Sequence, residues 1–128
     1  MFNFSGTRPN NLGVKDSKLT ACPGTPNCVN SQSSDTQSKI APLPSLAISE
    51  LKKIVESMER TTIIEATDNY LYAEFKTPLM GYVDDVEFYL DPKENVIHVR
   101  SASRLGKSDL GLNRKRVEEI RAKMQAQN

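Results

Sequence analysis

The chain has 128 residues, of which 38% are hydrophobic and 26% charged, and this size and composition are typical of one domain spanning residues 1–128. Its net charge of +1 argues against a general nucleic-acid-binding protein. No stretch reaches the roughly 18 apolar residues of a membrane-spanning helix, and the start lacks the basic and apolar regions of a signal peptide. These features predict a cytoplasmic protein without a membrane span.

Residues 1–45 are expected to form an irregular, proline-rich arm. Five of the seven prolines fall in this segment, and residues 30–38 form a polar run rich in serine. Such a composition is typical of extended or looped backbone. Regular structure is therefore expected from residue 46 to residue 126.

The first predicted element after the arm is an amphipathic helix. Its apolar residues recur at helical spacing: Ile48, Leu51, Ile54, Val55 and Met58. Residues 61–67 and 70–76 then read as two strands, because β-branched residues fill the first and apolar residues alternate in the second. Asp68 and Asn69 supply the turn between them, so the two strands are expected to pair as a hairpin.

A second hairpin and a final helix complete the predicted fold. Residues 82–90 and 95–103 alternate apolar and polar side chains around a turn at 91–94. Asn113 is expected to cap a last helix, whose buried stripe is Val117, Ile120 and Met124. The predicted class is α+β: a four-stranded antiparallel meander flanked by an N-terminal and a C-terminal helix.

One face of the predicted sheet is polar. A turn at 91–94 places Glu87 opposite His98 and Asp85 opposite Arg100, and keeps the apolar residues together on the other face. Tyr70, Tyr72 and Glu74 are predicted to share the polar face. Two interpretations are open: a solvated face with cross-strand ion pairs, or a ligand-binding surface with aromatic walls.

Charge is divided along the chain, with eleven acidic and five basic residues between Glu50 and Glu94, and eight basic and three acidic between Arg100 and Lys123. Cations at the start of the last helix oppose its dipole. Pairing with nearby carboxylates is favoured over anion binding at that helix start. The candidate ligand-binding residues are Asp85, Glu87, His98, Arg100, Arg104, Asn113, Arg114 and Arg116.

Cys22 and Cys28 flank a five-residue loop with two prolines. A structural disulfide is favoured, because so short a loop can bring the Cα atoms within about 7 Å; free thiols and reactive redox cysteines are the alternatives. Two cysteines and the single histidine, His98, do not form a recognisable metal-binding pattern. No metal and no cofactor are therefore expected.

Several segments together resemble a bacterial and plastid family catalogued as domain of unknown function 1499. They are Arg8-Pro-Asn-Asn-Leu-Gly13, Cys22-Pro-Gly-Thr-Pro-Asn-Cys-Val29, Gly81-Tyr-Val-Asp-Asp-Val-Glu-Phe88, Val99-Arg-Ser-Ala-Ser-Arg104 and Asp109-Leu-Gly-Leu-Asn-Arg-Lys-Arg116. The opening residues 4–13 look like the cyanobacterial and plastid branch. The resemblance implies no established reaction, substrate or cofactor.

These features lead to the hypothesis of a non-enzymatic binding or accessory protein that engages a small anionic ligand or a protein partner. The acidic strand and the arginine-rich segment are expected to form one charged network with the arm laid across it. One alternative is a small hydrolase or isomerase that uses Asp85 or Glu87 with His98 as acid and base, and Arg100 or Arg104 as an anion clamp. Another is a thiol redox protein.

Overall fold

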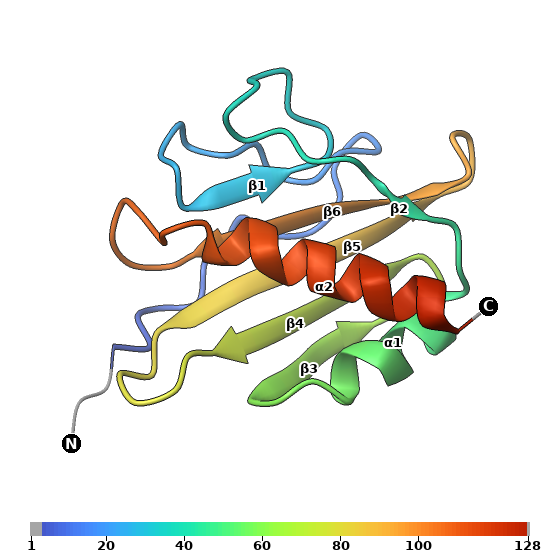
Figure 1. The fold of residues 1–128 in the computed structure, drawn as a ribbon. Coiled ribbons are helices and arrows are strands. Elements are labelled where there is room, and N and C mark those ends of the chain that lie inside the picture. The colour runs from blue at the N-terminus through green and yellow to red at the C-terminus, as the bar shows by residue number, and fades with distance from the viewer. Residues whose placement is uncertain (1–3, 128) are drawn as a thin grey trace.

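The computed structural model describes residues 4–127, and it is an α+β fold as predicted. Its elements in chain order are β1 (Cys28–Asn30), β2 (Leu43–Pro44), α1 (Ile48–Glu56), β3 (Thr61–Ala66), β4 (Tyr70–Lys76), β5 (Val83–Asp91), β6 (Val96–Ser103) and α2 (Leu112–Ala126). Both helices cover the same face of the antiparallel sheet (Figure 1). Neither is long and apolar enough to cross a membrane.

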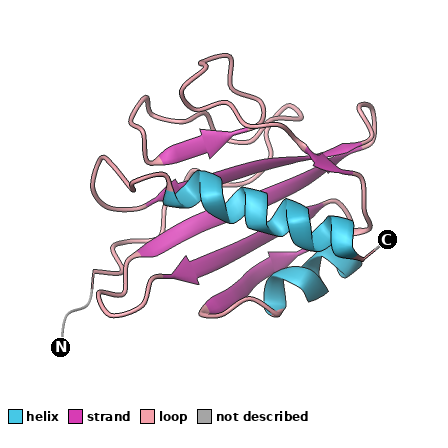
Figure 2. Ribbon diagram, viewed as in Figure 1, coloured by secondary structure: helices cyan, strands magenta, loops and turns pink. Residues whose placement is uncertain are grey.

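The sheet has six strands rather than the four expected. The predicted meander β3–β4–β5–β6 is present, but β1 and β2 both pair with the other edge of β6. An unpaired β6 would expose a row of backbone hydrogen-bonding groups, and these two short strands cover it. They come from the arm, which is therefore not wholly irregular, although loops make up most of it (Figure 2).

The predicted β5–β6 pairing is wrong by two residues. Glu87 lies opposite Arg100, and Asp85 lies opposite Ala102. The shift arises because Asp91 still belongs to β5, while Asn95 closes the turn with a φ of 56°, a left-handed conformation that asparagine tolerates. Because a two-residue shift returns every side chain to its own face, the predicted inward and outward faces are nevertheless correct.

The hydrophobic core lies between the helices and one face of the sheet. The α1 residues Ile48, Leu51, Ile54 and Val55 are buried there, as the helical spacing predicts. The predicted α2 stripe of Val117, Ile120 and Met124 packs into the same core. These side chains fix the helices on the sheet through burial of apolar surface, which stabilises by roughly 25 cal/mol per Å².

Asn113 does not cap α2 as expected. The helix begins two residues earlier than expected, at Leu112, and Gly111 occupies the cap position with a φ of 81°. Upstream, the Asp109 carboxylate accepts hydrogen bonds from the backbone N–H groups of Gly111 and Asn113, both at 2.9 Å. Asp109 thus accepts hydrogen bonds from backbone N–H groups that have no partner within the helix. The Asn113 side chain is not needed as the cap and points into the protein.

Candidate functional site

Tyrosine hydroxyls bind carboxylates on the polar face of the sheet. Tyr70 donates to Glu87 and Tyr72 to Asp85, each at 2.5 Å between oxygens. Arg104 donates two hydrogen bonds to Asp85, from Nε at 2.9 Å and from Nη2 at 2.8 Å. A carboxylate held by a tyrosine and a two-pronged guanidinium has most of its hydrogen-bonding capacity satisfied inside the protein.

The N-terminal arm covers this face. Figure 1 shows the arm (blue) passing along the side of the sheet that the helices leave free. The backbone N–H of Gly13 donates to Glu87 at 2.7 Å, and Arg8 donates to Glu74 at 2.6 Å. A small apolar cluster of Leu12, Leu19, Ile64, Tyr70, Tyr72 and Tyr89 packs alongside. The face is therefore closed by the chain itself, as expected for a network under the arm.

Burial sets the titration of the groups beneath the arm. It raises the pKa of Glu87 above its usual range, although Tyr70 and Gly13 donate to the carboxylate and oppose that rise. Burial also lowers the pKa of Arg100. Among the described residues, Glu87 Oε1 and Arg100 Nε are buried without a hydrogen-bond partner. Glu87 and Arg100 thus lie opposite each other on paired strands, and each keeps one buried polar atom without a hydrogen bond.

A second polar cluster lies on the opposite, helix-covered face. Arg116 Nη2 lies 2.7 Å from Asp84 Oδ2, a close charge contact without good hydrogen-bond alignment, and its guanidinium lies 4.9 Å from the centre of the Phe75 ring. Because neighbouring strand residues point to opposite faces, Asp84 and Asp85 cannot join one cluster. The expected single network is therefore two networks, one on each side of β5.

Asn113 is the hub of the helix-face cluster. Its Nδ2 donates to the Asn27 carbonyl at 3.2 Å and to Ser103 Oγ at 2.9 Å. Its Oδ1 accepts from Ser101 Oγ at 2.6 Å and from Arg116 Nη1 at 2.9 Å. One fully buried amide thus joins the arm, β6 and α2.

Arg114 is turned towards the arm. Its guanidinium donates to the backbone carbonyls of Lys39 and Gln37, both at 2.9 Å. Arg104 pairs with Asp85 and Arg116 with Asp84, so the favoured pairing with nearby carboxylates is confirmed for these two arginines. Ligand binding by the eight candidate residues stays a prediction.

His98 lies apart from the carboxylates with which sequence reasoning combined it. Its Nδ1 lies 2.9 Å from Ser31 Oγ, and its Nε2 lies 2.8 Å from Glu94 Oε1. Asp85 and Glu87 instead contact Arg104 and the two tyrosines. Among the described residues, His98 is therefore hydrogen-bonded to Ser31 and Glu94 and not to the carboxylates considered with it for a hydrolase or isomerase.

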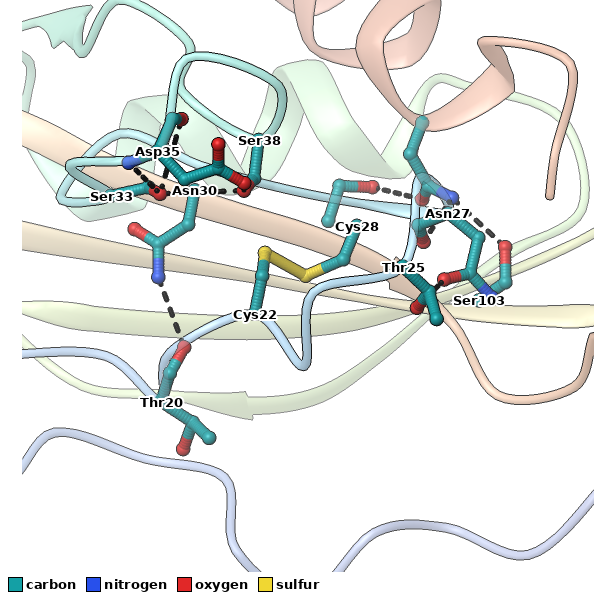
Figure 3. The surroundings of a disulfide bond; sticks show 12 residues. Thr20, Cys22, Thr25, Asn27, Cys28, Asn30, Ser33, Asp35, Ser38 and Ser103 are labelled. Carbon is teal, nitrogen blue, oxygen red and sulfur yellow. Dashed lines mark hydrogen bonds between the residues drawn. A yellow bond between two sulfur atoms is a disulfide. The ribbon is translucent and has the colours of Figure 1, made fainter. Parts of the chain in front are cut away.

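A disulfide closes the cysteine loop, and hydrogen bonds attach the loop to the end of β6. Cys22 and Cys28 form a disulfide with their Cα atoms 5.7 Å apart (Figure 3). Beside it, the Ser103 N–H donates to the Asn27 carbonyl at 3.0 Å, and Asn27 Nδ2 donates to the Gly106 carbonyl at 2.8 Å. The predicted disulfide is confirmed, and it joins Cys22 of the arm to the first residue of β1, which pairs with β6.

Sequence reasoning missed an apolar surface, here called the apolar end, formed by loops 77–82 and 105–112. Leu79 is 91% exposed and Leu110 98% exposed. Tyr82, Leu105 and Leu112 are also exposed, and together with Leu110 they line a hollow of 280 Å³. The sequence feature that could have revealed this surface is the presence of large apolar residues in glycine-containing loops, outside the helices and strands that form the core.

Comparison with known proteins places the chain in a family. Residues 18–124 match the family model described as "Protein of unknown function (DUF1499)". The chain belongs to this family. No curated protein and no solved structure matches it. For this DUF1499 protein, functional inference therefore rests on its own geometry, and the apolar end lies within the matched residues.

Proposed function

We propose that this DUF1499 protein is a binding or accessory protein whose apolar end docks onto an acidic protein partner. The observation that carries the proposal is the gathering of exposed apolar side chains. Five of the six large hydrophobic residues exposed in the described part of the chain belong to loops 77–82 and 105–112. Contiguous apolar patches on soluble domains commonly mark interaction sites.

The two most exposed leucines have an uncommon backbone conformation. Leu79 has a φ of 72° and Leu110 a φ of 54°, a left-handed conformation that is uncommon for residues with a side chain. Asp109 and the Phe4–Tyr82 ring stack, with centroids 5.4 Å apart, support the two loops. Strain of this kind persists where the surrounding structure imposes it and is often found at functional positions.

The charges around the apolar end favour an acidic partner. Lys76, Lys107 and Lys115 are exposed in or beside the two loops, and no ion pair among the described residues involves them. The neighbouring Asp109 is engaged at the helix start, and Asp84 is buried against Arg116. Lys107 therefore offers a positive charge to an acidic surface, while Lys76 and Lys115 share a hollow with Glu59, Glu118 and Glu119.

The hollow between the loops favours a protein over a membrane surface. Its lining includes Tyr82, Leu105, Leu110 and Leu112, and its volume is 280 Å³. This lies just below the roughly 300–1,000 Å³ of typical small-molecule sites. A hollow of that size beside protruding leucines suits an apolar anchor side chain from a protein partner, which is how interface hot spots are usually built.

The proposal is tested by selecting displayed random peptides on the full-length protein and measuring the affinity of those enriched. We expect peptides that combine acidic residues with a large apolar residue. Binding should weaken at least about tenfold in the double variant Leu79→Asn/Leu110→Asn, since about 1.4 kcal/mol of lost apolar contact corresponds to that factor. Asparagine is chosen because it tolerates the left-handed backbone at both positions.

Val14→Asn is the matched control, because Val14 is exposed but lies outside the two loops. This variant should bind the peptides like the unmodified protein. Peptide affinity should fall with added salt if Lys76, Lys107 and Lys115 contribute to binding. Equal binding by the double variant, or enrichment of basic peptides, would contradict the proposal. Leucine-dependent binding to phosphatidylglycerol vesicles without peptide binding would replace the protein partner with a membrane surface.

A further inference from the structure

A cluster of side chains whose chemistry could bind a metal ion lies at the β5–β6 hairpin turn, at the other end of β5 from the apolar end (Figure 1). Asp91 is the last residue of β5, Glu94 lies in the turn, and His98 lies on β6. One potential ligand atom from each residue lies within 4.8 Å of those of the other two. This cluster is separate from the proposed docking surface and from the carboxylates under the arm.

Two of the three side chains are buried and held in place. Asp91 Oδ1 accepts the backbone N–H of Lys93 at 2.8 Å and that of Glu94 at 3.3 Å. Its other oxygen, Oδ2, faces His98 Nε2 at 3.9 Å, which is too long for a hydrogen bond. Both side chains are more than nine-tenths buried, so a buried carboxylate oxygen and a buried ring nitrogen are aimed at each other across a gap.

The third side chain can adjust. Glu94 Oε1 lies 2.8 Å from His98 Nε2, and the glutamate side chain is 60% exposed. Ligand atoms around a tetrahedral zinc ion stand about 3.4 Å apart, given metal–ligand distances of roughly 2.0–2.2 Å. The two observed separations, 2.8 and 3.9 Å, lie on either side of that value. A rotation of the exposed Glu94 would lengthen the shorter separation, between Glu94 Oε1 and His98 Nε2.

From this geometry we infer that Asp91, Glu94 and His98 bind a divalent first-row transition cation, for which Zn²⁺ is the probe. One imidazole nitrogen and two carboxylate oxygens form a donor set that zinc accepts, with water completing the coordination. His98 would bind through Nε2 as the neutral ring. Its Nδ1 would then carry the proton and donate to Ser31 Oγ, now 2.9 Å away, the support that metal-bound histidines usually have.

The Asp91 carboxylate is suited to this role. Its Oδ1 is held by the backbone N–H groups of Lys93 and Glu94, which leaves Oδ2, the oxygen that faces His98, for a metal ion. The expectation of no metal rested on the cysteines and on His98 alone, and it overlooked two carboxylates brought to the histidine by one turn.

The test is isothermal titration of tag-free, chelator-treated full-length protein with ZnCl₂. We expect one zinc ion per chain and an upward shift of the melting temperature. Glu94→Gln should weaken zinc binding at least about tenfold, because even loss of an outer-shell partner costs that much in many sites. Glu59→Gln, at another exposed loop glutamate, should bind zinc like the unmodified protein.

Nitrogen-15 NMR of the His98 ring supplies a second readout that does not depend on the variants. Zinc should shift the Nε2 signal of His98 and leave a protonated Nδ1. Absence of zinc binding would overturn the inference, as would equal zinc affinity in Glu94→Gln and Glu59→Gln. Zinc binding with an unchanged His98 ring signal would place the ion elsewhere on the chain and would likewise overturn it.

Discussion

Breaking the Asp84–Arg116 pair should strongly destabilise the fold. The two side chains are 2% and 8% exposed, with Oδ2 and Nη2 2.7 Å apart. Replacing Arg116 by methionine keeps an unbranched stem over Phe75 and leaves the Asp84 charge buried without its partner. Loss of one member of a buried ion pair costs about 3–5 kcal/mol, and the lost contact with the Phe75 ring adds about 0.5–2 kcal/mol.

The complementary change, Asp84→Asn, should cost a similar amount because it leaves Arg116 uncompensated. The double variant buries neither charge, so its loss of unfolding free energy should be about 2–3 kcal/mol smaller than the sum of the single losses. Urea unfolding of all four proteins, with slopes compared, measures this coupling. The exposed Lys53–Glu50 pair is the control and should couple by less than about 1 kcal/mol. Additive losses at Asp84 and Arg116, or single losses below about 1 kcal/mol, would refute the reasoning.

Two further predictions concern the arm. Replacing Cys22 and Cys28 together by serine should lower the unfolding free energy by about 2 kcal/mol, since the disulfide closes a loop with a sequence separation of 6. Urea unfolding measures this loss. Reducing the disulfide of the unmodified protein should lower the unfolding free energy by the same amount. The second prediction is a change in the pH dependence of stability in Glu87→Gln. Burial raises the pKa of Glu87 in the folded protein. The stabilising contribution of protonated Glu87 is therefore complete at low pH and is lost as the pH rises through this raised pKa. The variant should therefore gain stability relative to the unmodified protein as the pH rises from about 4 to about 8, and parallel pH profiles would contradict the assignment.

The sequence predicted the central fold well because its patterns are local. Alternation in residues 70–76 and the helical spacing of Ile48, Leu51 and Ile54 each identify an element without knowledge of the rest of the chain. The two faces of β5 followed from the same alternation. The pairing of β5 with β6 did not, because Asp91 and Asn95 each suit a turn, and only the left-handed φ of Asn95 shows where the turn closes.

What the sequence did not reveal depends on contacts between distant segments. Strands β1 and β2 have three and two residues, too few for a pattern, and they form because β6 offers an open edge. The polar face of the sheet was recognised and the arm was expected to lie across it, but the contacts that hold the arm there were not predicted. The bond from Gly13 to Glu87 spans 74 positions in the sequence, and no local pattern encodes it.

The buried polar network under the arm is better explained by specificity than by stability. Exchanging buried charges for well-packed apolar residues is often neutral or stabilising, so stability alone does not account for Asp85, Glu87 and Arg104. An apolar face would hold the arm equally well in several positions, whereas Glu87 accepts the N–H of Gly13 at one position only. We therefore take this network to specify the path of the arm over the sheet. With this network assigned to the arm, the apolar end is the surface that we propose for a partner.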